Sequence, residues 1–211
     1  MAQVIPLSDE AEARPRPTAK ISFEDYLQLY DGTHAEWVDG EIEMGSPVSQ
    51  DHADESGFLE SVLRIYVEMR ELGKVFTSPY PMRLDPSERG REPDLMFIAN
   101  ENAQRIKKGF VDGPADLVVE IISPESIVRD RGTKFVEYEE GGVREYWLID
   151  TERRLAEFFG LGDDQRYHLL FSGAEGTFRS KVLEGFYLRV EWLWQQPLPK
   201  VATVLREMGI L

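Results

Sequence analysis

Apolar residues recur at three- and four-residue spacing in two early stretches of the chain and again near its end, a pattern typical of amphipathic helices. Ser22 begins the first stretch with an aspartate three residues later, as in a helix-capping box, and we expect a short helix that ends near Gly32. The second stretch, residues 51–72, predicts a long helix with Gly73 in the position that often follows a helix. Residues 201–208 predict a closing helix.

A β-hairpin is predicted between the first two helices. Residues 35–38 and 41–44 flank the pair Asp39-Gly40, and this pair favours the tight turn in which both central residues take positive φ angles. Two strand pieces and a polar loop are expected beyond the long helix, at 75–76, 82–84 and 83–91.

Two nearly continuous apolar runs, 93–98 and 117–122, predict central buried strands, and a third run, 145–150, predicts another strand. A charged segment between residues 124 and 141 separates the last two runs and predicts a helix, so this part of the chain forms a strand-helix-strand crossover. Later segments alternate and contain glycine and aspartate pairs, which predicts antiparallel strands at 155–159, 167–171, 178–182 and 187–190. The expected fold class is α/β, with a mixed central β-sheet flanked by helices.

Composition narrows the functional classes. Residues 1–20 are rich in Ala, Pro, Glu and Arg and lack a hydrophobic period, so we expect a disordered arm before one domain at residues 21–211. The absence of cysteine excludes thiolate metal sites and cysteine nucleophiles. No apolar run approaches the roughly 18 residues of a membrane span, and we expect a cytoplasmic protein. The formal net charge of −15 argues against tight, non-specific binding of DNA.

Two carboxylates stand in otherwise apolar strands, and they are the strongest chemical signal in the sequence. Asp94 follows a proline at the start of one run, and Glu120 lies inside Val-Val-Glu-Ile-Ile. A charge there costs several kcal/mol unless it is paired or binds a cation, and two neighbouring carboxylates repel unless a metal bridges them. Oxygen ligands favour Mg²⁺ or Mn²⁺. With Lys134 on the following helix, such a site is suited to phosphodiester hydrolysis.

Each of these residues also has a plain structural interpretation. Asp94 fits a turn at a strand edge, Glu120 fits a buried ion pair, and Lys134 alone fits a solvated helix surface. His52 is more often an ordinary residue at a helix start. Arg105, Lys107 and Lys108 form a basic cluster that would face either phosphates or solvent. Trp192 and Trp194 would pack in an interface, and Glu41 and Glu43 would be solvated residues of the hairpin.

Separated motifs in the order of a known family add to this picture. They are Glu36-Trp37-Val38-Asp39-Gly40-Glu41, His52, Pro93-Asp94, Leu117-Val118-Val119-Glu120-Ile121-Ile122-Ser123-Pro124, Arg129-Asp130-Arg131-Gly132-Thr133-Lys134 and Gly142-Val143-Arg144-Glu145-Tyr146-Trp147-Leu148-Ile149-Asp150. From about residue 20 to 195 the chain resembles the bacterial putative restriction endonuclease family of the PD-(D/E)xK nuclease superfamily. The resemblance implies a restriction-endonuclease-like fold and hydrolysis of phosphodiester bonds in DNA.

The resemblance also implies a ligand set. It makes Asp94 and Glu120 the acidic metal ligands, with the carbonyl oxygen of Ile121 as a third. In the superfamily's plain motif a lysine stands two residues after the second carboxylate, where this chain has Ile122. The family resemblance implies that Lys134 supplies the ammonium from the helix instead.

Two further residues and the partners follow from the same resemblance. Asp130 would orient Lys134 or the start of its helix, and Glu36 would complete the metal shell. The leading hypothesis is therefore a Mg²⁺- or Mn²⁺-dependent DNA endonuclease that acts as a homodimer and binds DNA weakly as a lone chain. Ile122 and the acidic surface leave an alternative, a catalytically degenerate nuclease-fold interaction or scaffold protein. A third reading is a metal-dependent hydrolase acting on RNA or a small phosphoester.

Overall fold

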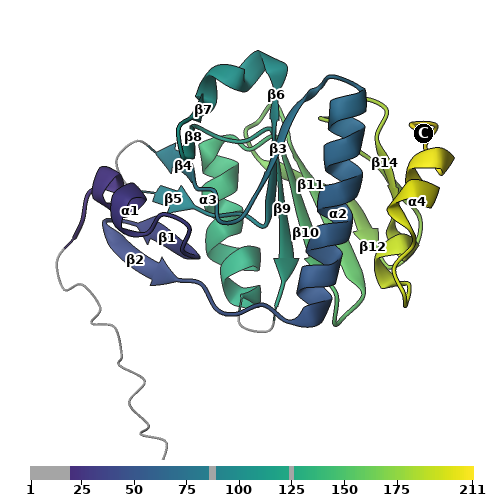
Figure 1. Cartoon of the computed structure of the whole chain (residues 1–211), viewed down its shortest axis with the longest axis horizontal. Helices are drawn as coiled ribbons and strands as arrows, with labels where there is room; N and C mark the ends of the chain where they lie inside the picture. The colour runs from purple at the N-terminus through teal and green to yellow at the C-terminus, as the bar shows by residue number, and fades with distance from the viewer. Residues whose placement is uncertain (1–19, 86–88, 124–125) are drawn as a thin grey trace, which may run out of the picture.

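The computed structural model describes residues 20–85, 89–123 and 126–211. Apart from Lys20, the predicted arm lies outside the described residues. The helices are α1 (Phe23–Leu29), α2 (Gln50–Met69), α3 (Lys134–Gly141) and α4 (Val201–Glu207). Helices α2, α3 and α4 flank a large mixed sheet, and a smaller sheet lies beside it together with α1 (Figure 1). No helix in the described part of the chain is long and apolar enough to span a membrane.

The large sheet has the strand order β12-β11-β10-β9-β6-β3. Its strands are β3 (Gly73–Thr77), β6 (Leu95–Ala99), β9 (Leu117–Ile122), β10 (Glu145–Asp150), β11 (Leu155–Leu161) and β12 (Tyr167–Gly173). Strands β9 and β10 are parallel, and every other neighbouring pair in this sheet is antiparallel. The crossover between β9 and β10 includes α3, preceded by a π-helical turn, η2 (Arg129–Thr133). The predicted strand-helix-strand unit is therefore confirmed.

Strand β9 separates two layers of the core. Leu117, Val119 and Ile121 pack with α2 and α4 on one face of the sheet. Val118 and Ile122 pack on the other face, in the cluster that contains Tyr138 of α3. Because side chains alternate along a strand, Glu120 faces α3 together with Val118 and Ile122.

The smaller sheet has the order β2-β1-β5-β4-β8-β7. Its strands are β1 (Ala35–Val38), β2 (Glu41–Met44), β4 (Met82–Asp85), β5 (Arg89–Arg91), β7 (Ile106–Lys107) and β8 (Phe110–Asp112). The predicted hairpin turn is confirmed, with Asp39 at φ 51° and Gly40 at φ 84°. The predicted cap of α1 is also confirmed, because Ser22 Oγ accepts a hydrogen bond of 3.0 Å from the amide of Asp25.

Two sequence predictions in this region are wrong. Helix α2 ends at Met69, and Glu71 rather than Gly73 takes the left-handed conformation after it, at φ 53°. Gly73 begins β3, where a Cβ atom would lie 2.0 Å from the carbonyl oxygen of Ile98. The predicted polar loop 83–91 contains strand β5, which inserts between β1 and β4. The neighbouring strands form backbone hydrogen bonds with these polar residues and so hold them in a strand. The polarity of the segment alone does not reveal such a tertiary contact.

The C-terminal part adds a two-stranded sheet, β13 (Thr177–Arg179) and β14 (Tyr187–Arg189). The remaining elements are the 3₁₀ helices η1 (Asn100–Arg105) and η3 (Val190–Trp194). Trp192 and Trp194 lie in η3, and their predicted role in an interface stays a prediction. Trp192 is buried in the core beside α4, and Trp194 packs on its edge and donates a 2.7 Å hydrogen bond to the carbonyl of Ala174.

Candidate metal-dependent active site

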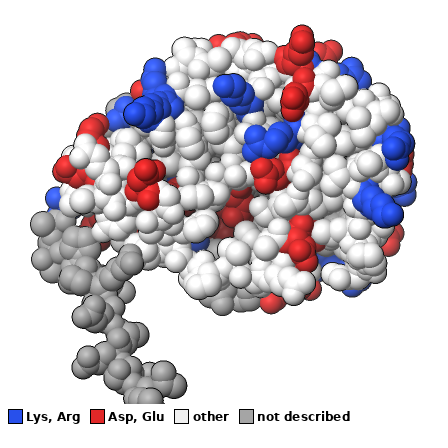
Figure 2. Space-filling model, in the orientation of Figure 1, with Lys and Arg blue, Asp and Glu red and all other residues white. Residues whose placement is uncertain are grey.

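A cavity of about 120 Å³ opens where the two sheets and the start of α2 meet. We call it the site pocket; its charged lining includes Glu36, Asp94, Glu120, Asp130 and Lys134. Figure 2 shows acidic side chains at the bottom of a hollow between the hairpin side of the molecule and α2. The structure therefore brings the four predicted catalytic residues and Asp130 to one pocket.

Lys134 is the centre of the hydrogen bonding. Its Nζ lies 2.8 Å from Glu120 Oε1 and 2.9 Å from Glu36 Oε1. The oxygen Oδ1 of Asp130 is 3.8 Å away, one helical turn earlier. The side chain of Lys134 is 3% exposed, so these carboxylates replace nearly all of its hydration. The interpretation of Lys134 as a solvated helix lysine is wrong.

Helix α3 presents a second donor to Glu120. Tyr138 stands four residues after Lys134, which places both side chains on the helix face that packs against β9. The Tyr138 hydroxyl donates a 2.7 Å hydrogen bond to the same Oε1 atom that accepts from Lys134. Glu120 is thus held by two donors from one helix.

Asp94 lies just before β6 and is more open than Glu36, Glu120 and Asp130, with 19% of its side chain exposed. Its Oδ2 accepts a 2.7 Å hydrogen bond from the amide of Ile121 and lies 3.2 Å from His52 Nε2. The contact of Ile121 is made by its N–H, and the role of its carbonyl oxygen stays a prediction. His52, from the first turn of α2, lines the site pocket beside Asp94, and its interpretation as a helix residue without a special task stays a prediction.

The charges in the site pocket act strongly on one another. Burial raises the pKa of Glu120, the charges of Asp130, Asp94 and Glu36 raise it further, and the Lys134 ammonium opposes them. Burial alone would raise the pKa of Glu36 as well, but Lys134 and Arg91 hold it at about 2. Burial would lower the pKa of Lys134, yet Glu120 and Glu36 keep it well above its ordinary value. Lys134 is therefore a fixed cation at neutral pH.

Arg91 pairs with two of the acids that line the pocket, Glu36 and Glu43, and sequence reasoning missed it. Its side chain is 1% exposed and donates to Glu137 through two hydrogen bonds of 2.7 and 2.9 Å. It also donates to Glu36 at 2.8 Å and to Glu43 at 3.0 Å. Glu41 and Glu43 are both exposed, as expected, and Glu43 also pairs with Arg91. No local pattern marks Arg91, because its partners come from β1, β2 and α3.

The donor set fits a divalent cation that takes much of its coordination from water. Among the described residues, no group of three or more His, Asp or Glu side chains is arranged to hold a metal. However, Asp94 Oδ1 and Glu120 Oε2 accept no hydrogen bond from any residue in the described ranges, and both residues line the site pocket. Mg²⁺ typically uses one or two carboxylates and keeps several waters.

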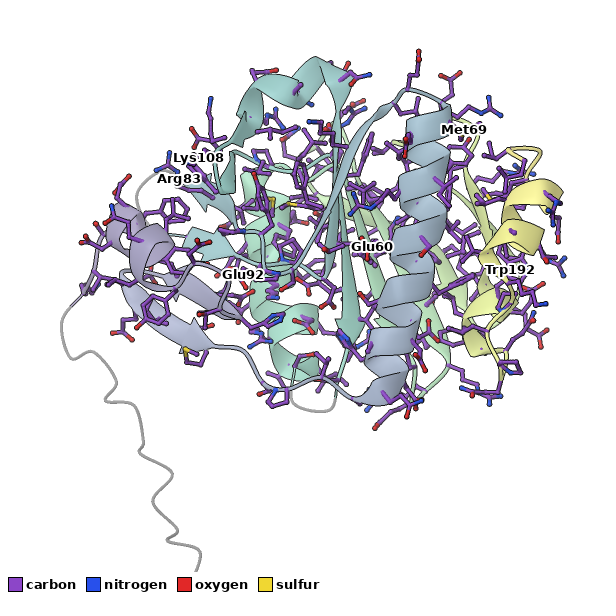
Figure 3. All side chains as sticks on the ribbon, in the orientation of Figure 1. Glu60, Met69, Arg83, Glu92, Lys108 and Trp192 are labelled. Atoms are coloured by element: carbon purple, nitrogen blue, oxygen red, sulfur yellow. The ribbon has the colours of Figure 1, made fainter. Side chains whose placement is uncertain are left out.

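The predicted basic cluster lies elsewhere. Arg105, Lys107 and Lys108 are not among the residues that line the site pocket. The Arg105 guanidinium donates to the carbonyl of Pro114 at 2.6 Å, and the Lys107 ammonium donates to the carbonyl of Gln104 at 2.8 Å. Lys108 and Glu92 are labelled in Figure 3, on the side of the molecule that carries α1 and the smaller sheet.

Comparison with known proteins identifies the family. The family model described as "putative restriction endonuclease" (Uma2) matches residues 23–191. The chain belongs to this Uma2 family. Its structure is similar to the crystal structure of a putative nuclease of DUF820 from Anabaena variabilis, with a TM-score of 0.68 and 16% identity over 82% of this chain and 97% of that one. No curated protein matches the chain.

These findings confirm the predicted family and the mixed α/β restriction-endonuclease-like fold. Membership of the Uma2 family supports a nuclease-type function at the level of the family description.

Proposed function

We propose that this Uma2 protein is a Mg²⁺- or Mn²⁺-dependent DNA endonuclease whose reaction takes place in the site pocket. The observation that carries the proposal is the buried Lys134 ammonium, bound to Glu120 at 2.8 Å beside the half-open carboxylate of Asp94. Asp94 and Glu120 would hold the metal through the oxygens that face the pocket, with the carbonyl oxygen of Ile121 as a third protein ligand. A bound divalent cation supplies charge stabilisation for the phosphate and lowers the pKa of a nearby water.

The mutual repulsion of the acids supports a cation in this position. Asp94, Asp130 and Glu36 all raise the pKa of Glu120, which means that the ionised site is electrostatically costly as it stands. A divalent cation between Asp94 and Glu120 relieves this cost.

Lys134 would act as a donor and not as a base. Because its pKa is raised, it keeps its proton at neutral pH, and it directs that charge toward the phosphate or the attacking water. Its position on α3 compensates for Ile122, since Ile122 and Glu120 face the same side of β9 and α3 covers that side. The ammonium thus arrives on the face from which a lysine at position 122 would project.

Glu36 would hold Lys134 in place. Its Oε1 accepts from Lys134 and from the amide of Glu92, at 2.9 and 3.1 Å, and its Oε2 accepts from Arg91 at 2.8 Å. Since both oxygens are occupied, we assign Glu36 to positioning the ammonium and not to direct metal ligation. DNA as substrate and a homodimer that cuts both strands rest on the family resemblance.

Nicking of supercoiled plasmid with Mg²⁺ or Mn²⁺ tests the proposal. We expect the wild-type protein to nick, and Glu120→Gln, Asp94→Asn and Lys134→Met to lose at least about a hundredfold in rate, the scale of losing an electrostatic catalytic group. Glu60→Gln is the matched control, because Glu60 is an exposed residue of α2 paired with Arg64. Equal nicking by the control and the three site variants would refute the assignment.

Calorimetry separates the proposed nuclease from a scaffold that retains the fold. Mn²⁺ binding that disappears in Glu120→Gln but persists in Glu60→Gln supports a metal site. No Mn²⁺ binding by the wild-type protein, together with no nicking, would favour the scaffold. A parallel panel with RNA and a small phosphodiester decides the substrate class, because the proposal requires a preference for DNA.

A further inference from the structure

A second groove begins where the site pocket ends. It has a volume of about 300 Å³ and is lined by Tyr26 of α1 and Tyr30 just after it, by Pro79–Pro81, and by Lys108 with its neighbour Gly109. We call it the tyrosine groove. Glu92 lines both the site pocket and the tyrosine groove, so the two cavities share a wall.

Hydrogen bonds fix this wall. One Glu92 oxygen accepts from the Tyr26 hydroxyl at 2.8 Å, and the other accepts from the amide of Ala35 at 3.3 Å. On the opposite side, the amide of Ser78 donates a 3.2 Å hydrogen bond to the carbonyl oxygen of Asp94. Ser78 immediately precedes the segment Pro79–Pro81 that lines the groove. The groove is therefore attached to the backbone of a proposed metal ligand.

The groove offers aromatic surface on a rigid frame. The rings of Tyr26 and Tyr30 stack with centroids 6.2 Å apart. Tyr80 stacks on Phe76 at 4.6 Å, and its hydroxyl donates a 2.8 Å hydrogen bond to the carbonyl of Lys107. Both Tyr30 and Tyr80 remain partly exposed, and the Tyr30 hydroxyl has no hydrogen-bond partner among the described residues.

One cation, Lys108, lines the groove together with the carboxylates of Asp31 and Glu92. The side chain of Lys108 is exposed and lines the groove, and it forms no ion pair with any described residue. Partly exposed aromatic faces beside a free cation match the two parts of a nucleotide, because bases stack on aromatic rings and phosphates bind cations.

We infer that the tyrosine groove is a subsite for the nucleotide that flanks the scissile phosphate, with the base against Tyr30 and Tyr80 and the next phosphate near Lys108. This inference rests on the proposed function, because it takes the site pocket as the place of phosphodiester cleavage. It adds a substrate preference. A base inside a duplex is already stacked on its neighbours, so a strand that enters the groove is locally unpaired.

Binding of a labelled single-stranded oligonucleotide, followed by fluorescence anisotropy in Ca²⁺, tests the subsite without requiring cleavage. We expect Tyr30→Leu to weaken binding about tenfold, equivalent to about 1.4 kcal/mol, and Tyr30→Phe to retain affinity within about twofold. Lys108→Gln should weaken binding and flatten its salt dependence. Lys107→Gln removes the same charge from the adjacent residue, which is tied to Gln104 and lies outside the groove, and it should bind like the wild type.

The outcomes distinguish the subsite from the catalytic proposal. If Tyr30→Leu and Lys108→Gln bind as tightly as the wild type, or if the wild type prefers duplex to single-stranded DNA, the subsite is refuted even if the plasmid is nicked. If the plasmid is not nicked but the predicted order of affinities holds, the catalytic proposal fails and the groove still binds nucleotides. Urea unfolding of Tyr30→Leu detects a folding defect, and the surface variant Lys108→Gln then decides.

Discussion

Replacement of Arg91 by methionine tests whether the buried ion network holds the candidate site together. Methionine retains a long side chain but removes the charge that Glu36 and Glu137 share. Breaking a buried ion pair by removing one partner costs about 3–5 kcal/mol. If Glu36 takes up a proton once Arg91 is absent, its charge no longer needs a partner. Protonating a carboxyl group with an ordinary pKa of 4.5 costs about 3.4 kcal/mol at pH 7, since each pH unit is worth about 1.4 kcal/mol. We therefore expect Arg91→Met to lose about 3–5 kcal/mol of unfolding free energy at pH 7.

Urea unfolding monitored by circular dichroism provides the measurement, and its pH dependence provides the signature. Because the charges of Lys134 and Arg91 depress the pKa of Glu36, this stabilisation is present above pH 4.5 and disappears as the pH falls toward about 2. The deficit of Arg91→Met should accordingly shrink below pH 5. Arg64→Met is the control, because its pair with Glu60 is exposed and should contribute less than about 1 kcal/mol. Equal losses in the two variants, or a deficit that does not change with pH, would refute the reasoning.

The remaining predictions concern stability, and urea unfolding measures each of them. Burial leaves Glu55 Oε2 without a hydrogen-bond partner among the described residues and raises its pKa to about 8. The cost of ionising the buried Glu55 is absent below pH 4.5 and grows to at most about 5 kcal/mol above pH 8. The free energy of unfolding of Glu55→Gln should therefore rise relative to that of the wild type as the pH rises, and a constant difference between the two would contradict this. Gly57→Ala, in the middle of α2 with open space at its Cβ position, should stabilise by about 0.5–1 kcal/mol. Gly73→Ala should destabilise the protein by several times that amount, because its Cβ would overlap the carbonyl of Ile98. If Gly73→Ala were instead the more stable of the two variants, β3 and β6 would lie further apart at this point than described.

Periodicity predicted much of the fold. The hairpin, the crossover and the central strands are local patterns of residues, such as Asp39-Gly40 and the run around Glu120, and each is confirmed by the structure. Prediction failed where a partner distant in sequence decides the conformation. Strand β5 pairs on one side with β1, which is distant in the sequence, and Gly73 is required by the close approach of β6.

The candidate site likewise contains residues that a local pattern predicts and residues that only the folded structure reveals. Glu120 is conspicuous in the sequence because a carboxylate in an apolar strand needs an explanation. Lys134 lies on the same crossover, so the motif around it leads to it. Arg91 and Tyr138 look ordinary in the sequence, and their contacts appear once β5 and α3 are brought to one place, whereas the family motifs already include His52. The structure also shows where part of the net charge of −15 lies. Some of the negative charges belong to the acid cluster inside the pocket and not to the surface that approaches a substrate.

The site pocket takes its residues from two sheets that share part of one core. Met82 of β4 and Val111 of β8 pack in the same buried cluster as Val118 and Ile122 of β9, so this part of the smaller sheet is fixed to the large one. Helix α1 and strand β1, which carries Glu36, have a separate cluster with only four buried residues: Phe23, Tyr26, Ala35 and Trp37. Small clusters of this kind can open locally at a free energy below that of global unfolding. Such an opening would withdraw Glu36 from Lys134 while leaving Asp94 and Glu120 in place. We therefore expect the lifetime of the complete constellation to depend on local opening of α1 and β1 and not only on the stability of the whole protein.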